Sequence, residues 1–248
     1  MIILHNKKII IFHNRKTSGT SLGMLMSLIS SKNDHITFHN VNLNIDKKII
    51  NKMNLNNNLL NLDFIESSKK IIRNSILFFL KKILIKRFKN KKYVVPFIIY
   101  KSKYYGHTTP EDFKNYISAK IYNNYSKFSV YRRFSDQLYS MYNHVMSYEK
   151  FISYEKWVSK NLDSFYKSSL KFYVNDLHFF NFHNMEDSLK VFCKKFKIDK
   201  NLVRQYKKVK LRSKNTKFPK ILKKKTKEKV MIKEKIIYKL VKHKLLSK

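Results

Sequence analysis

The chain has 248 residues, of which 43% are hydrophobic and 15% aromatic, so it can build a core and is not an intrinsically disordered protein. Its single cysteine, Cys193, excludes an internal disulfide framework and a multi-cysteine metal site. The net charge of +38 favours anionic partners generally, but lysine, isoleucine and asparagine are all overused, so the charge alone identifies no function.

The first predicted elements are a strand, a polar turn and a helix. Residues 9–12 form a β-branched and aromatic run that is typical of a buried parallel strand. After the turn, apolar residues recur at helical spacing, and we expect Thr17 or Ser18 to cap this helix. Because the amides of such a junction converge where the helix dipole favours an anion, the stretch predicts a phosphate or sulfate cradle. The residues that add a cation and hydroxyl groups to it are Lys16, Thr17, Thr20 and Ser21.

The next stretch is less regular. Residues 33–62 are polar and asparagine-rich, which predicts an irregular connection. Residues 69–88 predict a basic amphipathic helix that packs on the core, with attachment to a membrane surface as the alternative. Residues 92–100 predict a strand that Pro96 confines to a sheet edge or a bulge.

A clear helix start follows at Thr109. Thr109 is suited to the cap, Pro110 to the first helical position, and two acids fill the first turn. His107 stands just before this start.

Residues 126–148 again predict a strand followed by a helix. Arg132 follows the strand, and the helix begins near Ser135 and carries Ser140. An arginine at a strand end and a helical serine eight residues later can both reach one phosphate.

Two more helices complete the chain. One begins after Phe182 and runs past Cys193, which we interpret as a small core residue. The last is an amphipathic helix over residues 230–246, and its predicted apolar stripe consists of Ile237, Leu240, Val241 and Leu245.

Two of these stretches resemble the cofactor motifs of the carbohydrate-type (family 2) sulfotransferases, which use 3′-phosphoadenosine 5′-phosphosulfate (PAPS). Residues 13–21 are similar to the family's 5′-phosphosulfate loop, His-x-Pro-Lys-Thr-(Gly/Ala)-Gly-Thr-Ser, with Arg15 at the proline. In the family's 3′-phosphate motif, Gln137 stands at the second arginine. The residues in register with that motif are Arg132, Asp136, Ser140 and Tyr142. Residues 154–158 and 182–187 resemble its downstream elements.

The resemblance implies an α/β protein with the P-loop-like sulfotransferase fold, a short parallel sheet flanked by helices. One domain would span residues 1–248, with a variable insertion at about 33–90 and a basic C-terminal extension at about 207–248. Its implied activity is transfer of a sulfuryl group from PAPS to a hydroxyl of an acceptor, a carbohydrate, without a metal. The implied catalytic residues are Lys16 and His107. The implied cofactor-binding residues are Arg15, Lys16, Thr17, Ser18, Gly19, Thr20, Ser21, Arg132, Ser140 and Arg212.

Alternatives remain open at this point. His107 is either the general base beside the acceptor or a support for the turn. The departures at Arg15 and Gln137 suit a catalytically impaired sulfotransferase-like protein that binds a nucleotide or glycan. A basic nucleic-acid-binding protein is the other alternative, although no nucleic-acid signature is present. Because no apolar run is long enough for a signal peptide or a membrane span, we expect a cytoplasmic location.

Overall fold

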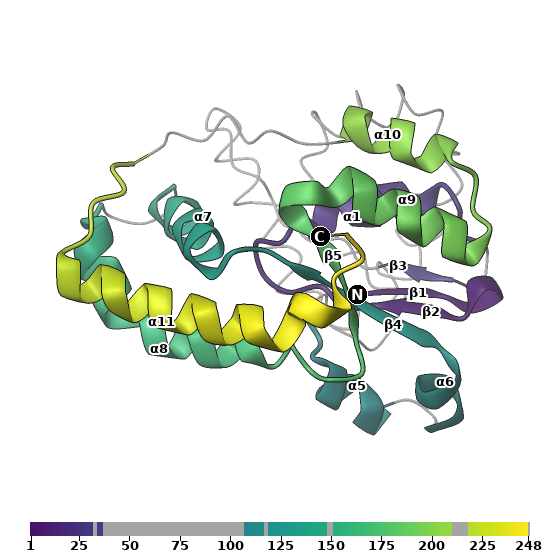
Figure 1. Cartoon of the computed structure of the whole chain (residues 1–248), viewed down its shortest axis with the longest axis horizontal. Helices are drawn as coiled ribbons and strands as arrows, with labels where there is room; N and C mark the ends of the chain where they lie inside the picture. Colours follow the sequence, from purple (N-terminus) through teal and green to yellow (C-terminus); the bar gives the residue numbers. More distant parts are fainter. Residues whose placement is uncertain (32–33, 37–106, 117–118, 148–150, 210–217, 248) are drawn as a thin grey trace, which may run out of the picture.

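The computed structural model describes residues 1–31, 34–36, 107–116, 119–147, 151–209 and 218–247. Over these residues the chain is an α/β protein in which helices cover a small mixed sheet (Figure 1). The predicted insertion at 33–90, the helix at 69–88, the strand at 92–100 and Arg212 lie outside the described residues, except that residues 34–36 are described.

The sheet has the strand order β3-β1-β2-β4-β5. Strands β2 (Ile9–Ile11), β4 (Ser126–Tyr131) and β5 (His178–Asn181) are parallel to one another. Strand β1 (Ile2–Leu4) is antiparallel to β2 and to the two-residue strand β3 (His35–Ile36).

The expectation of a short parallel sheet is therefore confirmed for β2, β4 and β5 and was wrong for the N-terminal part. A 3₁₀ turn, η1 (His5–Lys7), and the left-handed conformation of Lys8 (φ 51°) reverse the chain within a few residues. A connection this short can join only antiparallel strands, whereas parallel strands need a long crossover.

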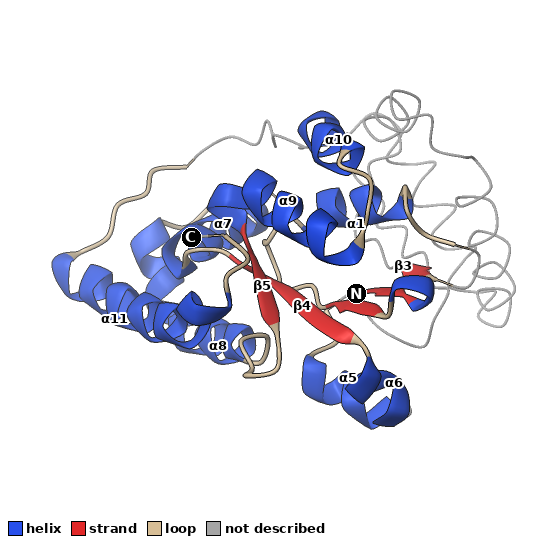
Figure 2. Cartoon of the chain, turned by 45° about the vertical axis from the view of Figure 1, so that its right-hand side comes forward, coloured by secondary structure: helices blue, strands red, loops and turns tan. Residues whose placement is uncertain are grey.

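Both faces of the sheet are buried. Successive strand residues point to opposite sides, so each strand contributes to two cores. In β2, Ile9 and Ile11 enter one core while Ile10 enters the other, and in β5 Phe179 and Phe180 divide in the same way. Helices α1 (Gly19–Ser27), α9 (Met185–Phe196) and α10 (Asn201–Val209) cover the first face. The helices on the second face are α5 (Pro110–Tyr116), α6 (Ala119–Asn124), α7 (Phe134–Met146), α8 (Tyr154–Leu170) and α11 (Lys224–Val241). Figure 2 shows the strands between these two groups.

The predicted start of α5 is confirmed in detail. The Thr109 hydroxyl accepts a hydrogen bond from the amide of Asp112 (3.1 Å) and donates to the Asp112 carboxylate (2.7 Å). The Thr109 amide also donates to that carboxylate (3.4 Å), which makes this a reciprocal capping box. His107 lies two residues before this cap.

The last helix differs from its prediction. Helix α11 begins at Lys224, six residues earlier than expected, and its buried residues are Val230, Ile237 and Val241. Leu240 is 42% exposed, so the prediction that it belongs to the buried stripe was wrong. The helix packs across α7 and α8, and the Leu246 amide then donates to the Phe179 carbonyl at the edge of the sheet (2.9 Å). Among the described helices, none combines the length and the apolar character needed to cross a membrane.

Candidate functional site

The candidate site is the loop that leaves β2 and enters α1. The Phe12 amide still donates to the Phe128 carbonyl of β4 (2.8 Å), after which residues 13–18 turn away from the sheet. The loop therefore lies at the carboxyl ends of the parallel strands β2 and β4. Open α/β sheets bind ligands in this position, outside the carboxyl ends of their strands.

The loop backbone takes an uncommon conformation twice within three residues. Lys16 (φ 58°) and Ser18 (φ 68°) both have left-handed φ values, although neither is glycine. Such residues cost of order 1–3 kcal/mol each and persist only where their surroundings hold them. Successive amides around left-handed residues form concave nests that bind anions, as in phosphate-binding loops.

Two side chains from residues 132–142, the stretch that includes the end of β4 and the start of α7, bond to this loop. Arg132, directly after β4, donates from Nη1 to the Lys16 carbonyl (2.8 Å). Gln137 of α7 is fully buried and donates from Nε2 to the Arg15 carbonyl (2.6 Å). Sequence reasoning treated Gln137 only as a lost arginine and missed its role. At position 137 the side-chain amide of glutamine thus has a structural role, because it bonds the backbone carbonyl of Arg15.

Loop residues 14 and 17 are bonded within the loop. The Asn14 Oδ1 accepts from the Arg15 amide (2.7 Å), and the Thr17 hydroxyl donates to the Asn14 carbonyl (2.8 Å). Both side chains are buried. The Thr17 hydroxyl hydrogen is therefore used to shape the loop.

The prediction that Thr17 or Ser18 caps α1 is confirmed for the position of Ser18 and was wrong for its side-chain bond. Ser18 occupies the N-cap position, but it makes no side-chain capping bond. Its hydroxyl instead lies near Tyr206 of α10, where it partly offsets the rise in the pKa of Tyr206 that burial causes. The first helical bond runs from the Leu22 amide to the Ser18 carbonyl (3.0 Å), so the amides of residues 19–21 precede the helical ladder. The backbone of Thr20 belongs to this first turn, and its side chain lies outside what the structure describes.

Gly19 leaves space that the His13 side chain fills. A Cβ atom placed on Gly19 would lie 1.4 Å from His13 Nε2, so a side chain there requires the imidazole to move. The φ of Gly19 is not positive, so the preference for glycine here arises from the space that His13 occupies and not from the backbone. The imidazole of His13 thus covers the start of α1.

His107, which precedes α5, also contacts this loop. Its Nδ1 lies 2.9 Å from the His13 carbonyl, and the two imidazole rings are 5.0 Å apart. Because a carbonyl can only accept, Nδ1 carries the proton of this bond and Nε2 of the neutral ring carries the lone pair. His107, which sequence analysis singled out, is brought to residue 13 across 94 positions of sequence.

The site is electropositive. Burial, together with the charge of Arg132, lowers the pKa of Lys16. Burial, together with the charge of Lys16, lowers the pKa of His144 on α7. No carboxylate pairs with Lys16 among the described residues, while nearby Asp136 pairs with Arg133 (2.8 Å). A partly buried ammonium with a cationic neighbour is stabilised most by a bound anion.

Arg132 and Ser140 are not joined by a hydrogen bond in the described part of the chain. The Arg132 guanidinium carbon lies 4.3 Å from the centre of the Phe182 ring, and its Nε is buried without a hydrogen-bond partner there. Ser140 lies half-buried farther along α7. The structure thus gives Arg132 a positioning contact that the sequence did not predict.

The motifs that resemble the sulfotransferase family, residues 13–21 and 132–142, therefore meet at one point of the fold. Within the described ranges, no group of three or more histidine, cysteine, aspartate or glutamate side chains could hold a metal ion. A scan against protein-family models, a search of curated proteins and a search of solved structures each gave no match for this chain.

Proposed function

We propose that the chain is a sulfotransferase that moves a sulfuryl group from PAPS to a hydroxyl of an acceptor, a carbohydrate. One observation carries the proposal: Arg132 of the second cofactor-like motif donates to the Lys16 carbonyl of the first. Two stretches that resemble the family only in sequence are thereby in contact around a half-buried lysine.

The residues of the loop are suited to hold the donor. The amides at the start of α1 and the nest around Lys16 and Ser18 present N–H groups to an anion. Arg132 Nε and Gln137 Oε1 are buried polar atoms without a hydrogen-bond partner among the described residues. One further donor and one further acceptor therefore lie where residues 132–137 meet the loop. PAPS, when bound, supplies the sulfuryl group and the 3′-phosphoadenosine 5′-phosphate that leaves.

Lys16 has the central role in the reaction that we propose. The acceptor oxygen forms a bond to sulfur while the bond from sulfur to the phosphate oxygen breaks, and negative charge grows on the oxygens around sulfur. The Lys16 ammonium and the amides of residues 19–21 stabilise this charge. Removal of one such preorganised donor costs on the order of 100- to 1000-fold in rate.

His107 is the proposed general base. Since its Nδ1 proton is held by the His13 carbonyl, its Nε2 accepts the proton that the acceptor hydroxyl loses. The same bond also fixes the plane of the ring, as catalytic histidines require.

A thermal-shift experiment tests the nucleotide part of the proposal. 3′-Phosphoadenosine 5′-phosphate should raise the melting temperature well above the effect of adenosine monophosphate, because only the former carries a 3′-phosphate. Equal effects of the two nucleotides, or none, would contradict the proposal.

A transfer assay with radiolabelled PAPS and a glycan panel tests the chemistry. Lys16→Ala should abolish transfer, whereas Lys7→Ala, an exposed lysine of η1, should not change it. A chain that binds 3′-phosphoadenosine 5′-phosphate but transfers nothing would instead be the catalytically impaired binding protein.

A further inference from the structure

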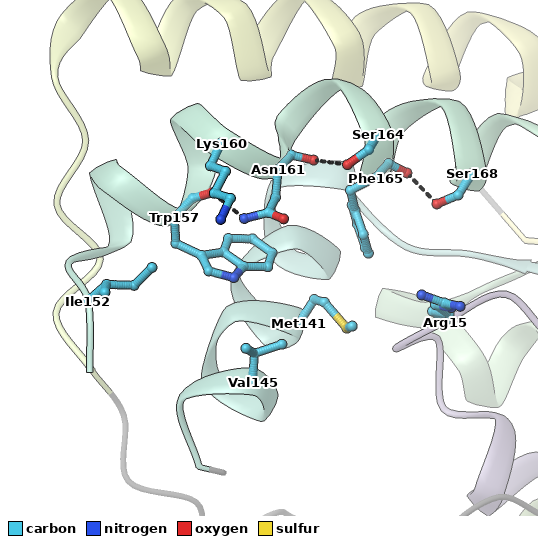
Figure 3. Close-up of a pocket in the computed structure, with 10 residues that line it drawn as sticks. All are labelled: Arg15, Met141, Val145, Ile152, Trp157, Lys160, Asn161, Ser164, Phe165 and Ser168. Carbon is cyan, nitrogen blue, oxygen red and sulfur yellow. Dashed lines mark hydrogen bonds between the residues drawn. The ribbon is translucent and has the colours of Figure 1, made fainter. Parts of the chain in front are cut away.

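A cavity of about 380 Å³ lies between helices α7 and α8. Its size falls within the range of small-molecule sites, about 300–1000 Å³. Figure 3 shows Arg15 of the loop at one end, with Ile152 at the other and Trp157 between them. The cavity therefore begins at the candidate site and runs away from it along α7.

The wall of this cavity is apolar on one side. Its apolar residues are Met141, Val145, Ile152, Trp157 and Phe165. Trp157 and Phe165 are nearly buried, at 6% and 7% exposure, so only a small, well-held part of each ring faces the cavity. Aromatic walls with a few polar groups are the usual lining of sites that bind small ligands.

Polar groups of α8 line the rest of the cavity. The side-chain Nδ2 of Asn161 donates to the Trp157 carbonyl (2.8 Å), and the Oδ1 of the same side chain can accept a hydrogen bond. The hydroxyls of Ser164 and Ser168 donate to carbonyls of their own helix (3.0 and 2.9 Å), so they offer lone pairs to a ligand. These oxygens suit the hydroxyl hydrogens of a sugar.

The charges at the cavity all have one sign. Arg15 and Lys160 line it, and none of the ten lining residues is an aspartate or glutamate. Neither cation pairs with a carboxylate among the described residues. A ligand with an anionic group therefore suits the cavity better than a neutral one of the same shape.

The cavity is also fixed relative to Lys16. The bond from Gln137 to the Arg15 carbonyl (2.6 Å) holds the loop on α7, the helix that also provides Met141 and Val145. His144, next to Val145, is close enough to Lys16 for the lysine charge to lower its pKa.

We propose that this cavity is the acceptor site and that it binds an acidic carbohydrate, with a sugar ring beside the exposed part of Trp157 and its carboxylate at Lys160. The acceptor role rests on the sulfotransferase function proposed above, whereas the binding itself does not. Arg15 then stands between the acceptor and the sulfuryl site.

Trp157 makes a direct test available, because it is the single tryptophan of the chain. The probe is a disaccharide that contains glucuronic acid, titrated into the whole chain while tryptophan fluorescence is recorded. The methyl ester of the same disaccharide is the neutral control. We expect a saturable change with the acid and a binding at least several-fold weaker with the ester.

Two variants locate the binding. Lys160→Ala should weaken the acidic disaccharide by about 3- to 10-fold, the effect of one charged contact near the surface, whereas Lys167→Ala, an exposed lysine elsewhere on α8, should not. Ser164→Phe places a ring in the cavity from an exposed position and should abolish the fluorescence change, with the fold checked by circular dichroism.

The outcomes separate this proposal from the function. Absence of a fluorescence change at millimolar probe, or equal binding of acid and ester, overturns the acidic-carbohydrate site. Competition by 3′-phosphoadenosine 5′-phosphate for the cavity shows that it holds the nucleotide, which also overturns the acceptor assignment. A normal response to the disaccharide in a chain that ignores this nucleotide supports the binding site and overturns sulfuryl transfer instead.

Discussion

The contact between Gly19 and His13 allows a sharp test of the loop geometry. In Gly19→Ala the new Cβ would lie 1.4 Å from His13 Nε2, less than half of an ordinary contact distance, so the imidazole must leave its position. Overpacking of this kind costs about 1–3 kcal/mol. In a His13→Ala background the space is empty, and alanine gains up to about 1 kcal/mol over glycine in a helix.

The same substitution should therefore change sign between the two backgrounds. Gly19→Ala destabilises the wild-type chain and stabilises the His13→Ala chain, which gives a coupling of at least about 1 kcal/mol in a double-mutant cycle. The assay is equilibrium unfolding in urea for the four proteins, with melting temperatures as a check at about 2–4 °C per kcal/mol. The same loss in both backgrounds would refute the steric reasoning, because the requirement for glycine would then have another origin.

Other predictions follow from the site and the fold. Lys16→Met should raise the melting temperature near neutral pH, because burial and Arg132 make the folded chain disfavour the ammonium, and the gain should shrink as the pH rises toward the ordinary lysine pKa of 10.5. The same variant should raise the pKa of His144 in a histidine NMR titration, and an unchanged pKa would contradict the proximity of the two groups. His107→Ala should lower transfer by about 100- to 10,000-fold without changing nucleotide affinity, and near-normal turnover would return His107 to a structural role. Thr109→Ala should cost about 1 kcal/mol of unfolding free energy through loss of the capping box, and a neutral effect would show that α5 needs no cap. Cys193 is 1% exposed, and burial raises the pKa of its thiol. It should therefore react with a thiol reagent only when the chain unfolds, and rapid labelling of the native protein would contradict its core position.

The sequence predicted the elements whose signals are local. The apolar run at 9–12, the cap at Thr109 and the helix after Arg132 all correspond to elements of the structure, because period, caps and turns are properties of neighbouring residues. The burial of Cys193 was predicted for the same reason.

What the sequence did not predict depends on residues far apart in the chain. The bonds from Arg132 and Gln137 to the loop carbonyls join positions 116 and 122 residues apart. The local sequence pattern at either end does not predict such bonds. Ser18 fits a cap by its residue type and stands at the N-cap position, but its side chain makes no capping bond and lies near Tyr206 of a distant helix. The cavity beside Trp157 is likewise formed by two helices and a loop, each unremarkable by itself.

The pairing of β2 with β4 also has a consequence during synthesis. The hairpin of β1 and β2 can close as soon as residues 1–12 are made, but the partner of its other edge begins only at Ser126. At about 5–20 residues per second, a ribosome needs roughly 6 to 23 seconds to reach it. Until then a fully apolar strand, Ile9 to Ile11, has an unpaired edge of the kind that pairs with other chains. Chaperones that cover this edge during synthesis should therefore improve the yield of folded protein more than a change at the finished surface.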